Sequence, residues 1–442
     1  MNYKIGMVSL GCSKNQTDSE IMLGILSERG NFIVSDPDEA DVIIVNTCGF
    51  IEPAKQESID TILEMAEYKK KNCRLLIAAG CLAERYNTLL AEELPEVDAV
   101  LGAGDYEKIA ETIEKAFAGE KIVMYGHKDA PHNEGLSRMV INSGAACYLK
   151  IADGCDNRCT YCAIPMIRGK YRSRKIEDIA EEARGLVEAG YRELILTAQD
   201  TTRYGIDIYG EYSLDKLLVK LSEIDGLKWI RIHYFYTEAI TGRLIDTMAE
   251  CDKILPYIDM PIQHSEDKIL RRMARKTSKS EIREKIAEIR RKMPDAVIRT
   301  TVMVGFPGET DEDFEALCDF VREIKFDRMG VFKYSREEDT PAAEFEDQVD
   351  EDVKEERFDI LMKIQQEISS EINARYIGKT LEVMTEGYDE ESYMYYGRSM
   401  RDSIEIDGLV YYAAHDDMNV GDFVKVKILD SDEYDLTGEA EE

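Results

Sequence analysis

The sequence lacks long apolar runs and is poor in positive charge. No stretch approaches the roughly 18 consecutive apolar residues of a membrane-spanning helix, and Met1–Lys4 opens the chain without the apolar segment of a secretory signal. Lys and Arg number 56 against 89 Asp and Glu, which gives a formal net charge of -33. We therefore expect a cytosolic protein without a membrane anchor, and not one that mainly grips a nucleic-acid backbone through a basic face.

The acidic excess leaves two interpretations open. It favours a basic protein as partner, or it is a solvated surface that aids solubility. At 442 residues the chain is long enough for about three domains with sizeable cores. Ten cysteines do not fit structural disulfides in a reducing compartment, so those with ordered spacing indicate metal binding or catalysis.

The first 125 residues alternate apolar runs with helical patterns, which predicts a parallel α/β domain. Thr17 and Glu20 have the spacing of a capping box. This spacing predicts a helix that starts there and runs to about Arg29. The apolar runs of this domain are Ile5–Leu10, Val42–Val45 and Leu75–Ala78.

Residues 126–146 are polar and interrupted by glycine and proline, which predicts a linker. Residues 147–375 alternate six strand-like runs with amphipathic helical segments, which predicts a partial parallel (β/α)6 barrel. Functional groups of such folds gather at the carboxyl ends of the strands. The runs are Tyr148–Ile151, Glu193–Thr197, Trp229–Phe235, Tyr257–Met260, Ile298–Val304 and Met329–Tyr334.

Residues 376–442 switch to short alternating runs punctuated by glycine, which predicts a small β-barrel. This segment holds 18 Asp or Glu against 5 Lys or Arg, so its local net charge is about -13. The fold class predicted for the whole chain is therefore α/β, with a parallel N-terminal domain, a central barrel and a small acidic β-barrel.

Cys155, Cys159 and Cys162 form a Cys-x3-Cys-x2-Cys motif directly after the first strand of the second domain. Three thiolates are one short of closing a cubane iron–sulfur cluster, so one iron is left to bind and activate a small molecule. The alternative is a structural zinc loop that takes its fourth ligand from elsewhere.

Cys12, Cys48 and Cys81 each lie just past the end of an apolar run in the first domain. The carboxyl ends of parallel strands share one edge of the sheet, so these three thiols could converge on a second three-coordinate cluster. They could also be ordinary buried cysteines. The remaining cysteines share no placement and are read as ordinary residues; they are Cys73, Cys147, Cys251 and Cys318.

Together these features resemble the radical SAM methylthiotransferase family over essentially the whole chain. The resemblance implies two [4Fe-4S] clusters and S-adenosylmethionine (SAM): one cluster generates a radical from SAM, and the auxiliary cluster supplies or carries the sulfur that a second SAM methylates. It also implies that the last domain is a TRAM-like module for substrate recognition. Ser13 departs from the proline of many relatives but replaces no ligand. The segments that carry the resemblance are Val8–Asn15, Asn46–Ile51, Ala79–Leu82, the Cys155 motif and Val304–Thr310.

Further segments resemble the branch of this family that modifies the β-carbon of an aspartate in the twelfth protein of the small ribosomal subunit. This resemblance implies abstraction of a β-hydrogen, transfer of methylsulfide to the carbon, and a flavodoxin- or ferredoxin-type reductant. The acidic last domain agrees, because ribosomal proteins are basic and phosphates would be repelled. The segments are Lys150–Cys155, Ala163–Gly169, Gly49–Lys55, Arg398-Ser399 and Ile406–Gly408.

Two rival functions remain. One is methylthiolation of a tRNA adenosine, which the charge of the last domain disfavours; the other is a non-catalytic iron–sulfur or zinc protein that binds a ribosomal partner.

Five more residues are candidates for the site. Tyr161, Gln199 and Gly305 are expected near SAM, although a polar strand end and a tight turn would explain the latter two equally well. Arg168 and Arg172 belong to a basic island in an acidic chain. They are expected to neutralise the carboxylate of SAM or of the substrate, or else to lie in a solvated loop.

Overall fold

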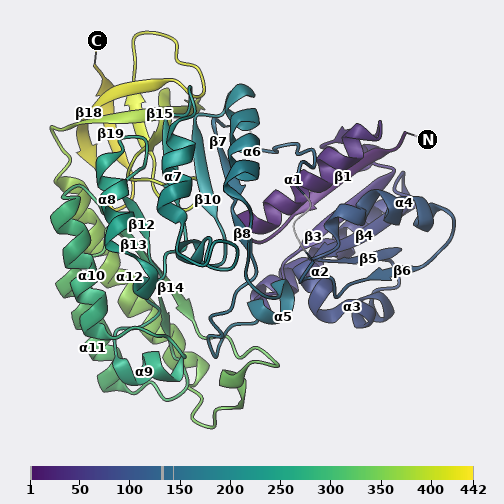
Figure 1. The fold of residues 1–442 in the computed structure, drawn as a ribbon, viewed down its shortest axis with the longest axis horizontal. Coiled ribbons are helices and arrows are strands. Elements are labelled where there is room, and N and C mark those ends of the chain that lie inside the picture. Colours follow the sequence, from purple (N-terminus) through teal and green to yellow (C-terminus); the bar gives the residue numbers. More distant parts are fainter. Residues whose placement is uncertain (1, 131–133, 143, 442) are drawn as a thin grey trace.

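The computed structural model describes residues 2–130, 134–142 and 144–441. The chain forms an N-terminal sheet domain, a central barrel of strands and helices, and a small C-terminal β-barrel, which is yellow in Figure 1. None of the helices in these ranges is long and apolar enough to cross a bilayer. The fold class predicted from the sequence is confirmed.

The N-terminal domain is a parallel sheet with strand order β2-β1-β3-β4-β5-β6. The three predicted apolar runs are β1, β3 and β4, and β3 and β4 are buried throughout. The sequence analysis missed β2, β5 and β6, which have only three or four residues and so show too little pattern. The strands are β1 (Lys4–Ser9), β2 (Phe32–Val34), β3 (Val42–Thr47), β4 (Leu75–Gly80), β5 (Ala99–Gly102) and β6 (Ile122–Met124).

Helices cover both faces of this sheet, which explains the continuous burial of its central strands β3 and β4. Apolar residues of α1 and α4 pack on one face, and those of α2 and α3 pack on the other. The helices are α1 (Ser13–Glu28), α2 (Glu52–Ala66), α3 (Cys81–Glu93) and α4 (Ile109–Phe117), with short 3-10 turns at Pro37–Glu39, Glu67–Lys70 and Tyr106–Lys108.

The predicted start of the first helix at Thr17 was wrong. Helix α1 begins at Ser13, with Cys12 in the extended N-cap conformation. The Oγ1 of Thr17 donates within the helix to the carbonyl of Ser13 at 2.9 Å. Glu20 is instead paired with Arg138, at 2.6 Å between Nη2 and Oε2. Thr17 and Glu20 therefore lie inside the helix and do not cap it, and Glu20 connects the helix to the segment that contains Arg138.

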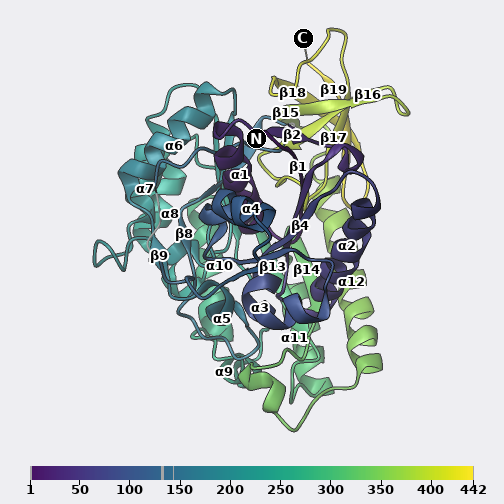
Figure 2. The same ribbon diagram turned by 90° about the vertical axis from the view of Figure 1, so that its right-hand side faces the viewer.

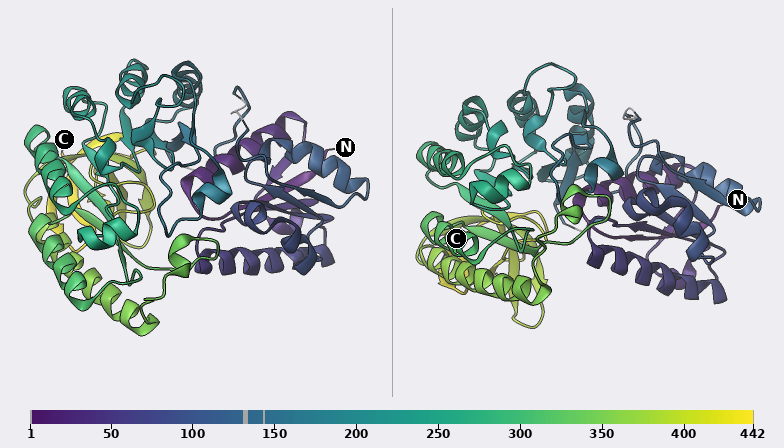
Figure 3. Two further views of the ribbon diagram at one scale, coloured as in Figure 1. Left: turned by 60° about the horizontal axis from the view of Figure 1, so that its bottom comes forward. Right: turned by 90° about the horizontal axis from the view of Figure 1, so that it is seen from below.

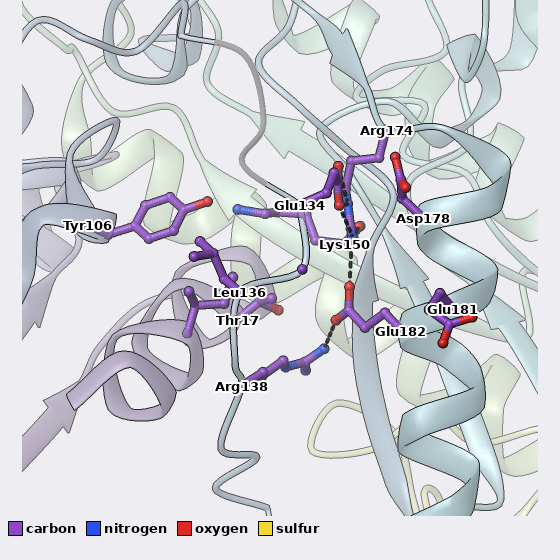
Figure 4. A pocket seen from close by; sticks show the side chains of 12 residues that line it. Thr17, Tyr106, Glu134, Leu136, Arg138, Lys150, Arg174, Asp178, Glu181 and Glu182 are labelled. Carbon is purple, nitrogen blue, oxygen red and sulfur yellow. Dashed lines mark hydrogen bonds and ion pairs between the residues drawn. The ribbon is translucent and has the colours of Figure 1, made fainter. Parts of the chain in front are cut away.

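The segment predicted as a linker lies in the seam between α1 and α6. A Cβ on Gly24 of α1 would come within 2.2 Å of the carbonyl oxygen of Ser137, so the two backbones touch. Arg138 also bonds Glu182 of α6 at 2.8 Å. A cavity of about 240 Å³ lies in this seam. Figure 4 shows side chains that line it, with the ion pairs that Arg138 and Arg174 make to Glu182. Residues 131–133 and 143 of the predicted linker lie outside the described residues.

The central domain contains the six predicted parallel strands in two sheets of order β11-β10-β7 and β12-β13-β14. A parallel bridge between Ile230 and Ile254 joins the two sheets, and the helices lie outside them (Figure 3). A short hairpin of β8 and β9 flanks the Cys155 loop. The strands are β7 (Ala146–Lys150), β8 (Ala152–Asp153), β9 (Arg172–Ser173), β10 (Glu193–Thr197), β11 (Trp229–Ile232), β12 (Tyr257–Asp259), β13 (Val297–Val304) and β14 (Arg328–Lys333).

The helices of the central domain follow the strands, and its largest core lies between the two layers. The helices are α5 (Ile164–Arg168), α6 (Ile176–Glu188), α7 (Leu214–Ser222), α8 (Gly242–Glu250), α9 (Asp267–Arg272), α10 (Lys279–Lys292), α11 (Asp311–Ile324) and α12 (Glu351–Ala374). Short 3-10 turns lie at Thr201–Arg203, Thr237–Ala239 and Pro341–Glu344.

The C-terminal strands close into a barrel of order β15-β16-β17-β19-β18 at one end of the molecule (Figure 2). The end of β16 and the loop after it are buried against the amino-terminal ends of the central strands. There Arg398 bonds Glu193 at 2.8 Å, and Asp402 bonds Arg328 at 2.7 Å. The strands are β15 (Thr380–Asp389), β16 (Met394–Ser399), β17 (Val410–Ala413), β18 (Phe423–Ser431) and β19 (Leu436–Ala440).

Candidate active site

The register of the N-terminal sheet brings Cys12, Cys48 and Cys81 to one edge. Ser9 pairs with Asn46 and Asn46 pairs with Ala79, so β1, β3 and β4 end level with one another. Cys12 caps α1, Cys48 directly follows β3, and Cys81 opens α3. The three thiols therefore come from adjacent loops on the carboxyl edge of the sheet, the usual place for ligands in open α/β folds.

Glycines allow these three loops to approach one another. A Cβ on Gly11 would lie 3.1 Å from the Sγ of Cys48, and a Cβ on Gly49 would lie 2.8 Å from the Cα of Leu82. Gly80 has φ +91°, a conformation that side chains rarely adopt. The backbone itself is thus shaped to hold the N-terminal thiols together.

The electrostatics of this trio show that its members influence one another. Burial raises the pKa of Cys81 to about 12, with Arg168 opposing this rise and negative charge on Cys12 and Cys48 adding to it. Partial desolvation would raise the pKa of Cys12, but Lys14 and Arg168 outweigh it, so this pKa lies below its ordinary value. The three thiols therefore lie close enough for their charges to interact, and Lys14 and Arg168 are the cations beside them.

Cys155, Cys159 and Cys162 lie on the loop between β8 and α5. The backbone N–H of Cys155 bonds the carbonyl of Gly169 at 3.1 Å, and that of Cys162 bonds the carbonyl of Cys159 at 3.1 Å. All three cysteines line a cavity of about 450 Å³ that also contacts Met166. Burial raises the pKa of Cys155 to about 12 and raises that of Cys162 as well.

The donor sets of both trios fit iron–sulfur clusters. Each offers three thiols on glycine-bearing loops, and Cys thiolates are the usual ligands of such clusters. Within the described ranges, no three His, Cys, Asp or Glu side chains are placed to hold a single metal ion. The cavity beside the Cys155 loop gives a small molecule room to reach these thiols.

Two of the residues expected near SAM are brought together. The ring of Tyr161 meets Phe306 edge to face, with centroids 6.5 Å apart, and Phe306 directly follows Gly305. Gly305 has φ +70°, and a Cβ there would lie 2.2 Å from the Cγ of Lys354. Burial and negative charge on Cys159 raise the pKa of Tyr161 well above its ordinary value.

The third, Gln199, lies just beyond the carboxyl end of β10. Its Nε2 donates to the Oδ1 of Asp153 at 2.8 Å, which ties it to the start of the cysteine loop. Its Oε1 is buried and has no hydrogen-bond partner among the residues that the structure describes. This oxygen is available to a donor on a bound molecule.

The two arginines have different surroundings. Arg168 is buried, and its guanidinium bonds Asp18 at 2.5 Å and Asn15 at 3.1 Å, both on α1. Its Nη2 also lies 3.4 Å from the Sγ of Cys81. Arg172 donates to the carbonyl of Lys170 at 2.7 Å. Arg168 thus faces the N-terminal trio, whereas Arg172 braces its own loop.

The sequence analysis missed several charged residues of the site. Asp18 and Lys150 form a buried ion pair across the seam between the domains, and Lys14 lies 3.6 Å from the ring centre of Tyr234. Arg275 is buried over the ring of Tyr236, 4.2 Å from its centre. The one available signal was a lysine at position 150, at the end of an otherwise apolar strand, which predicts a buried partner.

Comparison with known proteins agrees with this arrangement. Three family models match: Uncharacterized protein family UPF0004 over residues 4–102, the Radical SAM superfamily over 149–321 and the TRAM domain over 377–440. A solved structure with a similar fold is that of the radical S-adenosylmethionine methyltransferase TsrM from Kitasatospora setae, with cobalamin and a [4Fe-4S] cluster bound. Its TM-score is 0.57 at 13% identity, and 77% of each chain is covered. The fold and the cysteine motif define a radical SAM enzyme.

Two relatives narrow this class. The ribosomal protein uS12 methylthiotransferase RimO of Clostridioides difficile (strain 630) is 53% identical over 437 residues, which cover 99% of this chain and 98% of the relative. The protein of the same name from Thermoanaerobacter sp. (strain X514) is 52% identical over 435 residues, which cover 98% of this chain and 99% of the relative. The chain belongs to the RimO family of radical SAM methylthiotransferases.

Proposed function

We propose that this enzyme adds a methylthio group to the β-carbon of an aspartate in ribosomal protein uS12. The observation that carries the proposal is the short path between the two cysteine trios. Helix α5 starts two residues after Cys162, and its last residue, Arg168, contacts Cys81. Helix α5 thus connects the trio proposed to generate the radical directly to the trio proposed to hold the sulfur.

Two [4Fe-4S] clusters and SAM are the proposed cofactors. Cys155, Cys159 and Cys162 would hold the cluster that binds SAM, and Cys12, Cys48 and Cys81 would hold the auxiliary cluster. When bound, these groups supply the radical, the sulfur and the methyl group. The residues of this chain orient them and keep them apart from water.

The residues expected near SAM have distinct proposed tasks. Tyr161 and Phe306 would form an apolar wall. Gly305 would contact SAM through its backbone, because Lys354 fills the space where a Cβ would stand. Gln199 would accept a hydrogen bond through its buried Oε1. Arg172 is a candidate for the carboxylate of SAM or of the substrate. The proposed division of labour assigns residues 1–125 to the auxiliary cluster, 147–375 to SAM chemistry and 376–442 to substrate recognition, with 126–146 as the linker.

The proposed substrate is a basic protein of the cytoplasmic ribosome. The relatives carry uS12 in their names, and the acidic C-terminal barrel has the charge that complements a basic protein. Its excess of carboxylates would repel the phosphates of tRNA. Electrons would come from a small electron-donor protein of the flavodoxin or ferredoxin type.

The test is a parallel reaction with two substrates. The protein is reconstituted anaerobically with iron and sulfide, given SAM and a reductant, and offered uS12 and bulk tRNA in separate tubes. Mass spectrometry then scores replacement of a hydrogen by a methylthio group. A gain on one aspartate of uS12 supports the proposal, whereas a gain only on adenosine contradicts the substrate assignment.

The control for this reaction is a protein that lacks the SAM-binding motif. The triple variant Cys155→Ala, Cys159→Ala, Cys162→Ala should neither cleave SAM nor modify uS12. Modification by this variant would contradict the role given to the motif.

A further inference from the structure

The guanidinium of Arg168 occupies the centre of the contact between the first two domains. It is 2% exposed. Its Nη1 bonds the Oδ2 of Asp18 at 2.5 Å and approaches the Oδ2 of Asp153 at 3.3 Å. Its Nη2 lies 3.1 Å from the Oδ1 of Asn15 and 3.4 Å from the Sγ of Cys81. One face of the cation thus meets carboxylates, and the other meets a sulfur.

The position of this guanidinium is fixed relative to both trios. Helix α5 is short and is joined directly to the Cys162 loop. Its Ile167 and the neighbouring Ala163 are fully buried against Cys81 and Ala103. Packing and hydrogen bonds therefore hold Arg168 in one place, as required of a group that orients a ligand.

A second buried cation provides a comparison. Lys150 pairs with the same Asp18, lies 3.6 Å from Asp153 and faces the ring of Tyr106 at 5.1 Å. Its exposure is 2%, the same as that of Arg168. The two cations thus share burial and counter-ions, but it is Arg168 that contacts the sulfur of Cys81.

We infer that Arg168 is a positioning residue for the auxiliary cluster: its N–H group holds the sulfur of Cys81 and makes that cluster easier to reduce. The inference rests on the proposed function, which assigns a cluster to Cys12, Cys48 and Cys81. Reduction adds negative charge to a cluster. A hydrogen bond to a ligand sulfur and a nearby fixed cation both stabilise that added charge, and both tune reduction potentials.

The experiment isolates the auxiliary cluster in the full-length chain. In the Cys155→Ala, Cys159→Ala, Cys162→Ala background, the remaining cluster is titrated with a reductant and followed by electron paramagnetic resonance. Arg168→Met should lower the equilibrium constant for reduction about tenfold, which corresponds to 59 mV for a one-electron couple. Lys150→Met, which removes a cation from the same network, should change it less than about threefold, and Arg168→Lys should recover part of the loss.

Each other outcome also decides the inference. An unchanged potential in Arg168→Met, or an equal shift in Lys150→Met, overturns it. If Arg168→Met loses its iron while its circular dichroism stays native, recovery of iron in Arg168→Lys supports the inference, and equal loss in Lys150→Met overturns it. If the background protein itself binds no iron, the cluster assignment of the proposed function fails, and the inference fails with it.

Discussion

Glu337 of the loop after β14 forms a buried ion pair with Arg85 of α3, at 2.8 Å between Oε2 and Nη1. The same carboxylate accepts the backbone N–H of Glu52 at the start of α2 and pairs with Lys55 at 3.1 Å. The segment after β14, light green in Figure 3, reaches the helices of the N-terminal domain. These contacts hold the central domain and the N-terminal domain together beside both cysteine trios.

Glu337→Gln should weaken this contact between the two domains. The substitution leaves Arg85 and Lys55 buried without their shared counter-ion, and breaking such a pair costs about 3–5 kcal/mol. The free energy of unfolding in urea should fall accordingly, with faster hydrogen exchange at the start of α2. The matched control is Glu39→Gln, which removes an exposed pair with Lys4 and should cost less than about 1 kcal/mol. Equal losses in the two variants would contradict the interpretation.

The same carboxylate predicts sensitivity to acid. Burial alone would raise the pKa of Glu337, but Ser335, Arg85 and Lys55 outweigh it and hold that pKa below its ordinary value of 4.5. Because the folded-state pKa is depressed, the stability it contributes is fully present above about pH 4.5 and is lost as pH falls through the folded value. Urea titrations at stepwise pH should show a shallower acid loss in Glu337→Gln than in the wild type. Parallel curves would refute this.

Gly49→Ala should disrupt the N-terminal trio through sterics alone. The new Cβ would meet the Cα of Leu82 at 2.8 Å, and backbone cannot yield as a flexible side chain does. We expect iron content to fall by about half after reconstitution, because only one of the two clusters would assemble. Gly185→Ala on α6, where a Cβ meets nothing within 4 Å, should keep its iron and gain about 0.5–1 kcal/mol of stability. Full iron in Gly49→Ala would argue against the role given to this edge.

Removing the two cysteine trios in turn should separate the two sites. The wild type should bind about eight irons, and each triple alanine variant about four, if each trio holds one cubane. Cys73→Ala, Cys251→Ala and Cys318→Ala are the matched controls and should leave iron and acid-labile sulfide unchanged. Retention of all the iron in either triple variant would show that its cysteines are not ligands.

The sequence could predict which cysteines follow the ends of the parallel strands. Cys12, Cys48 and Cys81 follow apolar runs, and the parallel register then places them on one edge. Local pattern was insufficient where a partner lies far along the chain. Arg168 is 150 residues from Asp18, so its buried surroundings depend on how two domains dock. The same holds for Glu20, which has the spacing of a capping box but pairs with the distant Arg138.

Strand β16 and the loop after it tie the C-terminal barrel to the central barrel. Arg231 and Glu193 are fully buried, and Arg398 of the C-terminal barrel completes their ion pairs. A chain cut before β15 would remove Arg398 from this network and would expose the amino-terminal ends of the central strands. The domain proposed to recognise the substrate therefore also closes one end of the central barrel. Replacing it with the corresponding domain of another methylthiotransferase would require matching substitutions at that end of the central barrel.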